Sequence, residues 1–106
     1  MDNVLDKIDS EVKENKILVY MKGTEEAPQC GFSAAVVDIF KVLGFPFQTR
    51  DVLQNDGLRE GIKQYSNWPT VPQVFINGKF IGGCDITREL YESGALKKLI
   101  EEALKK

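Results

Sequence analysis

Apolar residues along the chain repeat either at the spacing of one helical face or as short continuous runs. The helical spacing predicts an amphipathic helix over roughly residues 3–14 and a second helix that starts at Cys30. The continuous run Ile17–Met21 is typical of a buried strand. Residues 45–52 are interpreted as a second strand. Pro46 favours an edge position for it, because proline cannot donate to a strand ladder.

A β-hairpin is predicted in the second half of the chain. The dipeptide Asn77-Gly78 separates the apolar runs Gln73–Ile76 and Lys79–Ile81, and this is the strongest short-range signal for a hairpin. A short helix precedes it, with Asn55 or Asp56 as its N-cap.

Helical spacing resumes after the hairpin, with Asp85 expected to cap one helix and Ser93 the last one. The order is therefore αβαβαββα, with the final helix either continuous or split. The first two strands, joined by a crossover helix, should be parallel, and that unit should be right-handed. We expect an α/β fold with a four-stranded mixed sheet flanked by helices, in which the first strand lies between the edge strand and the hairpin.

Length and composition predict a single domain over residues 1–106. Hydrophobic residues make up 42% and charged residues 28%, which is ordinary for a soluble globular protein. The longest apolar run is too short to cross a bilayer, so no membrane association is expected. The net charge of -2 lacks the basic excess that nucleic-acid binding usually needs.

The chain has two cysteines and no histidine, and this count excludes many mechanisms. Serine–histidine–aspartate catalysis and histidine-bearing zinc sites are excluded. Two thiols cannot complete a four-cysteine metal site within one chain, nor do they make a disulfide-rich secreted scaffold. The acidic N-terminal segment, which begins at Met1, lacks the features of a signal or transit peptide, so we expect a reducing, cytoplasmic location.

Cys30 is the leading candidate for chemistry. It follows the loop after the first strand and starts a helix, where free N–H groups and the helix dipole favour a thiolate. Lys22, at the other end of the loop, adds positive charge. The alternative is a buried, inert cysteine. Ser33 stands where a Cys-x-x-Cys motif would have its second thiol, so dithiol exchange at this site is excluded.

The chain resembles a monothiol glutaredoxin of the Cys-Gly-Phe-Ser class. The resemblance covers nearly the whole chain and implies a thioredoxin-like fold, in agreement with the element order. It is carried by the runs Lys22-Gly23-Thr24, Pro28-Gln29-Cys30-Gly31-Phe32-Ser33, Trp68-Pro69-Thr70-Val71-Pro72-Gln73 and Gly82-Gly83-Cys84-Asp85-Ile86.

The resemblance implies that glutathione binds beside Cys30. Lys22 and Arg59 would hold the glycine carboxylate of the tripeptide, although either cation could instead be an ordinary surface charge. Val71 would pair its backbone with the cysteine of glutathione, with a cis peptide before Pro72; the alternative is a plain turn. A threonine–proline pair is usual in the loop after Lys22, and an aromatic residue is frequent at position 71, so both places depart from the family pattern.

Cys84 and Asp85 would hold the γ-glutamyl end of glutathione. The backbone N–H of Cys84 suits its α-carboxylate and the carboxylate of Asp85 suits its ammonium group. The alternatives are a buried, small apolar role for the Cys84 thiol and a helix N-cap for Asp85, which can coexist with ligand binding. Whether Cys84 can form a disulfide with Cys30 stays open.

The resemblance also implies a function in iron–sulfur cluster traffic. Clusters need four ligands, normally thiolates. Cys30 from each of two protomers and two glutathione thiols would hold a [2Fe-2S] cluster across a homodimer, to be passed to apo iron–sulfur proteins. The first alternative is an enzyme, a weak glutathione-dependent oxidoreductase that removes glutathione from proteins. The second is a binding module for BolA-like proteins.

Overall fold

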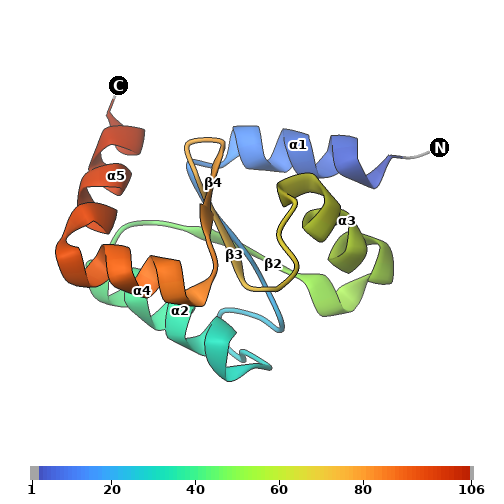
Figure 1. Cartoon of the computed structure of the whole chain (residues 1–106), viewed down its shortest axis with the longest axis horizontal. Helices are drawn as coiled ribbons and strands as arrows, with labels where there is room; N and C mark the ends of the chain where they lie inside the picture. The colour runs from blue at the N-terminus through green and yellow to red at the C-terminus, as the bar shows by residue number, and fades with distance from the viewer. Residues whose placement is uncertain (1–2, 106) are drawn as a thin grey trace.

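The computed structural model describes residues 3–105, and its elements follow the order expected from the sequence (Figure 1). The elements are α1 (Val4–Glu14), β1 (Ile17–Met21), α2 (Gly31–Leu43), β2 (Gln48–Asp51), the short 3-10 helix η1 (Val52–Gln54), α3 (Asp56–Ser66), β3 (Gln73–Ile76), β4 (Lys79–Gly82), α4 (Cys84–Ser93) and α5 (Ala95–Leu104). The final helix is split at Gly94, whose φ of +86° ends α4 in a left-handed conformation. Among residues 3–105, no helix is long and apolar enough to span a membrane.

The four strands form one mixed sheet in the order β2-β1-β3-β4. β1 pairs parallel with β2 and antiparallel with β3, and the β3–β4 pair is the predicted hairpin around Asn77-Gly78. β2 therefore lies at the edge, as Pro46 predicted, and β1 lies beside the hairpin strand β3. The predicted α/β class and four-stranded mixed sheet are confirmed.

The second strand is shorter than the predicted range of residues 45–52. It covers Gln48–Asp51, and Val52 already belongs to η1. Pro46 has no N–H, so the ladder with β1 starts only after it. Phe45 and Phe47 instead pack against the buried cluster under α2. The strand ends at Asp51, whose carboxylate accepts a hydrogen bond from the Leu53 N–H and caps η1.

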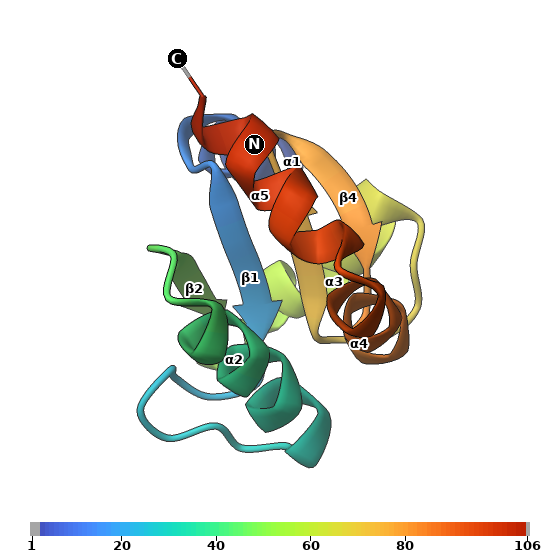
Figure 2. The same ribbon diagram turned by 90° about the vertical axis from the view of Figure 1, so that its left-hand side faces the viewer.

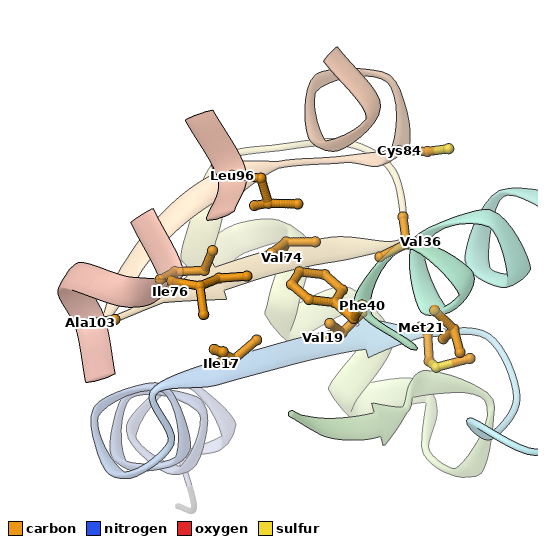
Figure 3. Packing of buried hydrophobic residues seen from close by; sticks show 12 residues of the cluster. Ile17, Val19, Met21, Val36, Phe40, Val74, Ile76, Cys84, Leu96 and Ala103 are labelled. Atoms are coloured by element: carbon orange, nitrogen blue, oxygen red, sulfur yellow. The ribbon is translucent and has the colours of Figure 1, made fainter. Parts of the chain in front are cut away.

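Side chains that alternate along β1 divide the core into two layers. Ile17, Val19 and Met21 belong to the cluster beneath α2, α4 and α5, which Figure 3 shows from close by. Leu18 and Tyr20 belong to the cluster beneath α1 and α3. Figure 2 shows the same arrangement from the side, with helices on both faces of the sheet.

Two of the three predicted helix caps need correction. The Asn55 side chain does cap α3 and accepts from the Leu58 N–H at 3.2 Å. Asp85, in contrast, is not an N-cap: Gly83 takes the cap position, so α4 starts at Cys84, two residues earlier than a cap at Asp85 would place it. Asp85 lies in the first turn of α4, where its negative charge interacts favourably with the helix dipole.

Ser93 was predicted to cap the last helix, but it is the last residue of α4, and Gly94 takes the N-cap position of α5. The Ser93 hydroxyl still accepts a hydrogen bond from the Ala95 N–H at 3.3 Å. The prediction therefore found a real hydrogen bond but placed the helix boundary one residue early.

Candidate functional site

A groove of about 590 Å³ lies at the C-terminal end of β1, and all six predicted site residues line it. This size is within the usual range for small-molecule sites. The predicted residues that line it are Lys22, Cys30, Arg59, Val71, Cys84 and Asp85. They come from the β1–α2 loop, the starts of α2 and α4, α3 and the segment before β3, so the fold gathers segments that are far apart in the chain.

Cys30 occupies the N-cap of α2, with extended backbone angles and a partly exposed side chain. Its thiol pKa is lowered below the ordinary value. The Ser33 amide is the largest cause; burial acts in the opposite direction; and the Phe32 amide, the Lys22 charge and the Ser33 hydroxyl add to the lowering. The side chain of an N-cap residue faces the amides of the next two or three residues, which explains why this position favours a thiolate.

Lys22 lies in the loop that runs from the tip of β1 to α2 (Figure 2), and its backbone is hydrogen-bonded both to α2 and within the loop. Its N–H donates to the Ser33 hydroxyl at 3.1 Å, and its carbonyl accepts from the Gln29 N–H at 2.9 Å. The next residue, Gly23, has a φ of +90°, and a Cβ there would lie 2.5 Å from the Ala27 carbonyl oxygen. Only glycine fits this close approach.

Three cationic side chains among the described residues line the groove. Arg59 and Lys63 are four residues apart on α3 and both line the groove, as does Lys22. Lys63 is not among the predicted site residues, although its spacing from Arg59 places both on the same face of α3. Together these side chains provide positive charge for an anionic group such as a carboxylate.

The segment before β3 forms another wall. The Val71–Pro72 peptide bond is cis, as expected from the family resemblance. The buried Gln73 side chain donates from Nε2 to the carbonyl oxygens of Trp68 and Thr70, at 3.2 and 3.0 Å, and so ties the segment to the start of β3. Trp68, which belongs to one of the family motifs, also lines the groove, although it is not among the predicted site residues.

The start of α4 completes the groove with groups of different character. The Cys84 side chain is 7% exposed and lies at the margin of the buried cluster, as Figure 3 shows. Its Sγ accepts from Arg88 Nη2 at 3.5 Å, and the same nitrogen lies 3.6 Å from the exposed carboxylate of Asp85. Cys30 and Cys84 are both free thiols. The groove thus combines one accessible thiol, cationic side chains and, at Asp85, a carboxylate.

A family model described as Glutaredoxin matches residues 17–81, which include β1, the thiol motif, β3 and all but the last residue of β4. The chain belongs to the glutaredoxin family. It is 56% identical to a monothiol glutaredoxin of Synechocystis over 98 residues, which cover 92% of each chain. It is 48% identical to a probable monothiol glutaredoxin of Rickettsia typhi over 92% of this chain and 88% of the relative.

A chloroplastic monothiol glutaredoxin of rice is 52% identical over 98% of this chain, but the match spans only 60% of that longer relative. Among solved structures, reduced apo GrxS14 of poplar has a TM-score of 0.82 and 49% identity, with 93% of this chain and 91% of that chain covered. A buckwheat glutaredoxin–glutathione complex has a TM-score of 0.84 and 33% identity, with 94% and 89% covered. These similarities confirm the monothiol glutaredoxin assignment and the thioredoxin-like fold.

Proposed function

We propose that the protein is a glutathione-dependent carrier that holds a labile [2Fe-2S] cluster between two protomers and passes it to apo-proteins. The observation that carries this proposal is a single accessible thiol of lowered pKa in a groove that is lined by cationic side chains and by the carboxylate of Asp85. A thiolate is the form of cysteine that binds metal. The family, whose relatives are named monothiol glutaredoxins, supports the same function.

Glutathione fits the charges of the groove. In the proposal, Lys22 and Arg59 bind its glycine carboxylate, and the backbone of Val71 pairs with its cysteine. The N–H of Cys84 and the carboxylate of Asp85 receive the two charged groups of its γ-glutamyl end. This orientation brings the glutathione thiol to Cys30. The buckwheat relative was solved as a complex with glutathione, which supports the assignment.

The ligand count requires a second chain. Between residues 3 and 105, no group of three or more histidine, cysteine, aspartate or glutamate side chains is placed to hold a metal ion. A [2Fe-2S] cluster needs four ligands. Cys30 supplies one, so a partner's Cys30 and two glutathione thiols make up the set. Because the two glutathione ligands are not covalently attached to the protein, the cluster is expected to leave readily for an apo-protein.

Anaerobic reconstitution with iron, sulfide and glutathione tests the proposal. The expected product is a coloured dimer that loses its colour when an apo ferredoxin-type acceptor gains a cluster. Cys30→Ser should give a colourless monomer, whereas Cys84→Ser, the matched control at the other thiol, should still form the dimer. A colourless wild-type protein, or full colour in Cys30→Ser, would falsify the proposal.

A weak oxidoreductase activity is the second candidate, favoured by the same lowered thiol pKa. The Cys30 thiolate would attack the glutathione sulfur of a glutathionylated protein and release that protein's thiolate. A second glutathione thiolate would then attack the Cys30 mixed disulfide, which yields oxidised glutathione and free Cys30. Turnover of a glutathionylated peptide with excess glutathione measures this activity. Single-turnover capture without turnover would count against it.

The partners and location beyond glutathione are also proposals. The recipients are apo iron–sulfur proteins, and a BolA-like protein is a further candidate partner. A complex that forms equally well with apo protein and with Cys30→Ser would favour a cluster-independent binding module instead. The cytoplasmic location stays a prediction, since the rice and Arabidopsis relatives are named chloroplastic.

A further inference from the structure

Asp51 does not line the groove, yet its carboxylate is hydrogen-bonded to the loop that carries Lys22. It is the last residue of the edge strand β2 and lies opposite Met21, the last residue of β1. Its Oδ1 accepts from the Gly23 N–H at 2.9 Å and from the Leu53 N–H at 2.9 Å. Its Oδ2 accepts from Gln54 Nε2 at 3.3 Å. The carboxylate therefore joins the Lys22 loop to the edge of the sheet.

The peptide groups on both sides of Lys22 are fixed by different partners. The Lys22 N–H donates to the buried hydroxyl of Ser33, and the following N–H, of Gly23, donates to Asp51. The Lys22 carbonyl accepts from Gln29 within the loop. With these groups tied, the direction in which the Lys22 side chain leaves the backbone is determined, and Lys22 extends into the groove wall.

The charge of Asp51 strengthens this arrangement. Burial alone would raise the pKa of Asp51, but the Leu53 and Gly23 amides and the Gln54 side chain outweigh it, and the pKa is lowered. The carboxylate is thus ionised at neutral pH, and a hydrogen bond to an ionised acceptor is roughly twice as strong as a neutral one. An alanine at this position would leave the Gly23 N–H without its acceptor.

We propose that Asp51 is a positioning residue for glutathione: its carboxylate fixes the backbone at Gly23 and thereby aims Lys22 at the glycine carboxylate of the tripeptide. Ser33 is the second anchor of the same lysine, so the hydroxyl that replaces a second thiol has a structural role of its own. This inference rests on the proposed glutathione binding, because it assigns Asp51 a part in that site.

A double-mutant cycle tests the inference without a cluster. The measurement is the equilibrium between oxidised glutathione and the reduced full-length protein, which gives Cys30 glutathionylated and one free glutathione, followed by mass spectrometry. Lys22→Met and Asp51→Ala should each lower glutathionylation by about threefold to tenfold, the scale of one charged contact. Asp51→Ala added to Lys22→Met should cause no further loss, because both act through the same lysine.

Two further backgrounds separate positioning from a general structural effect. In Arg59→Met, which removes the other proposed carboxylate ligand, Asp51→Ala should still cause its full loss. Asp51→Asn keeps an acceptor oxygen but loses the charge, so its equilibrium should lie between those of Asp51→Ala and the wild type. If the alanine variant folds poorly, this partial loss, absent in the Lys22→Met background, provides the same test. Asp38→Asn, which changes an exposed carboxylate on α2, is the matched control and should behave like the wild type.

The outcomes are distinguishable. If Asp51→Ala causes an equal loss with and without Lys22, the positioning role is overturned while glutathione binding by Lys22 stands. If Lys22→Met and Arg59→Met both leave the equilibrium unchanged, the glutathione assignment of the proposed function is wrong, and the inference is overturned with it. Exchange of the Gly23 amide, measured by NMR, should be faster in Asp51→Ala; unchanged exchange would overturn the anchoring contact itself.

Discussion

Cys30 and Cys84 both lie at helix starts and both line the groove, yet their surroundings differ. Cys30 is the N-cap of α2, outside the first helical turn, whereas Cys84 is the first residue inside α4. The N-cap side chain faces the free amides of the following residues, and the first helical residue does not. Cys30 is accordingly partly exposed and of lowered pKa, while Cys84 is buried at the edge of the core and contacts Arg88.

The comparison teaches that a helix start activates a thiol only at the correct position. A shift of one residue changes which groups the sulfur faces. The same groove can therefore use one cysteine for its sulfur and the other for its backbone N–H, as we propose for Cys30 and Cys84.

The largest expected effect separates the two thiols directly. Cys30→Ser should abolish the fast reaction of the native protein with iodoacetamide. Cys84→Ser should leave that reaction almost unchanged, because an exposed thiolate reacts at least about tenfold faster than a buried thiol. Peptide mapping after brief alkylation gives the two rates. Faster labelling of Cys84 than of Cys30 in the folded wild type would contradict the comparison.

A transplanted thiol is the second test. The double variant Cys30→Ser/Gly31→Cys moves the sulfur from the N-cap to the first helical residue while serine keeps the cap. A Cβ at Gly31 meets no atom within 4 Å, so the helix should tolerate the change. The thiol pKa should rise toward its ordinary value of about 8.5.

The pH dependence of alkylation measures this shift, and its sign follows from the protonation of the thiol. Since the wild-type pKa is lowered, the native Cys30 thiolate persists as pH falls through the ordinary thiol range. It is lost only as pH falls through its own, lower pKa. The transplanted thiol should already lose its reactivity within the ordinary range. Equal pH profiles for the two proteins would show that N-cap geometry is not the cause.

A smaller effect is expected from Lys22→Met. The Ser33 and Phe32 amides lower the Cys30 pKa more than the Lys22 charge does, so the thiol should lose only part of its activation. The alkylation rate at neutral pH should fall by about threefold or less, and added salt should reduce the difference from wild type. Lys97→Met, on an exposed position of α5, is the control. A loss as large as that of the transplant would assign the activation to charge rather than to the helix start.

The smallest effect concerns Arg88. Its ion pair with Asp85 is solvent-exposed, and such pairs contribute little. Arg88→Leu should therefore change the alkylation rate of Cys84 by less than about twofold, since the thiol is shielded by packing against the core. A large rise in Cys84 labelling would show that the arginine, and not the packing, protects this thiol.

The fold was largely readable from the sequence because its signals are local. The apolar run Ile17–Met21, the Asn77-Gly78 hairpin and the edge preference of Pro46 each act within a few residues. The errors have local causes too: Phe45 and Phe47 pack into the core without joining the ladder, and Gly83 takes the cap position expected for Asp85.

The residues that line the groove could be predicted from the sequence, but the hydrogen bonds that hold the Lys22 loop in place could not. The family resemblance named six residues, five of them within its motifs and the sixth, Arg59, outside them, and all six line the groove. The contacts of Asp51 and Ser33 with the Lys22 loop depend on strand register and on the path of a long loop, which no local pattern encodes. Lys63 is the exception, because its spacing from Arg59 was visible in the sequence.

Trp68 gives the groove an optical reporter of its own. It is the only tryptophan in the chain and it lines the groove, so no other indole contributes to the emission signal. Indole emission shifts with the amount of water around the ring. A ligand that displaces water from this wall should therefore change the intrinsic fluorescence of the unlabelled protein, and titration with glutathione can be followed without modifying either thiol.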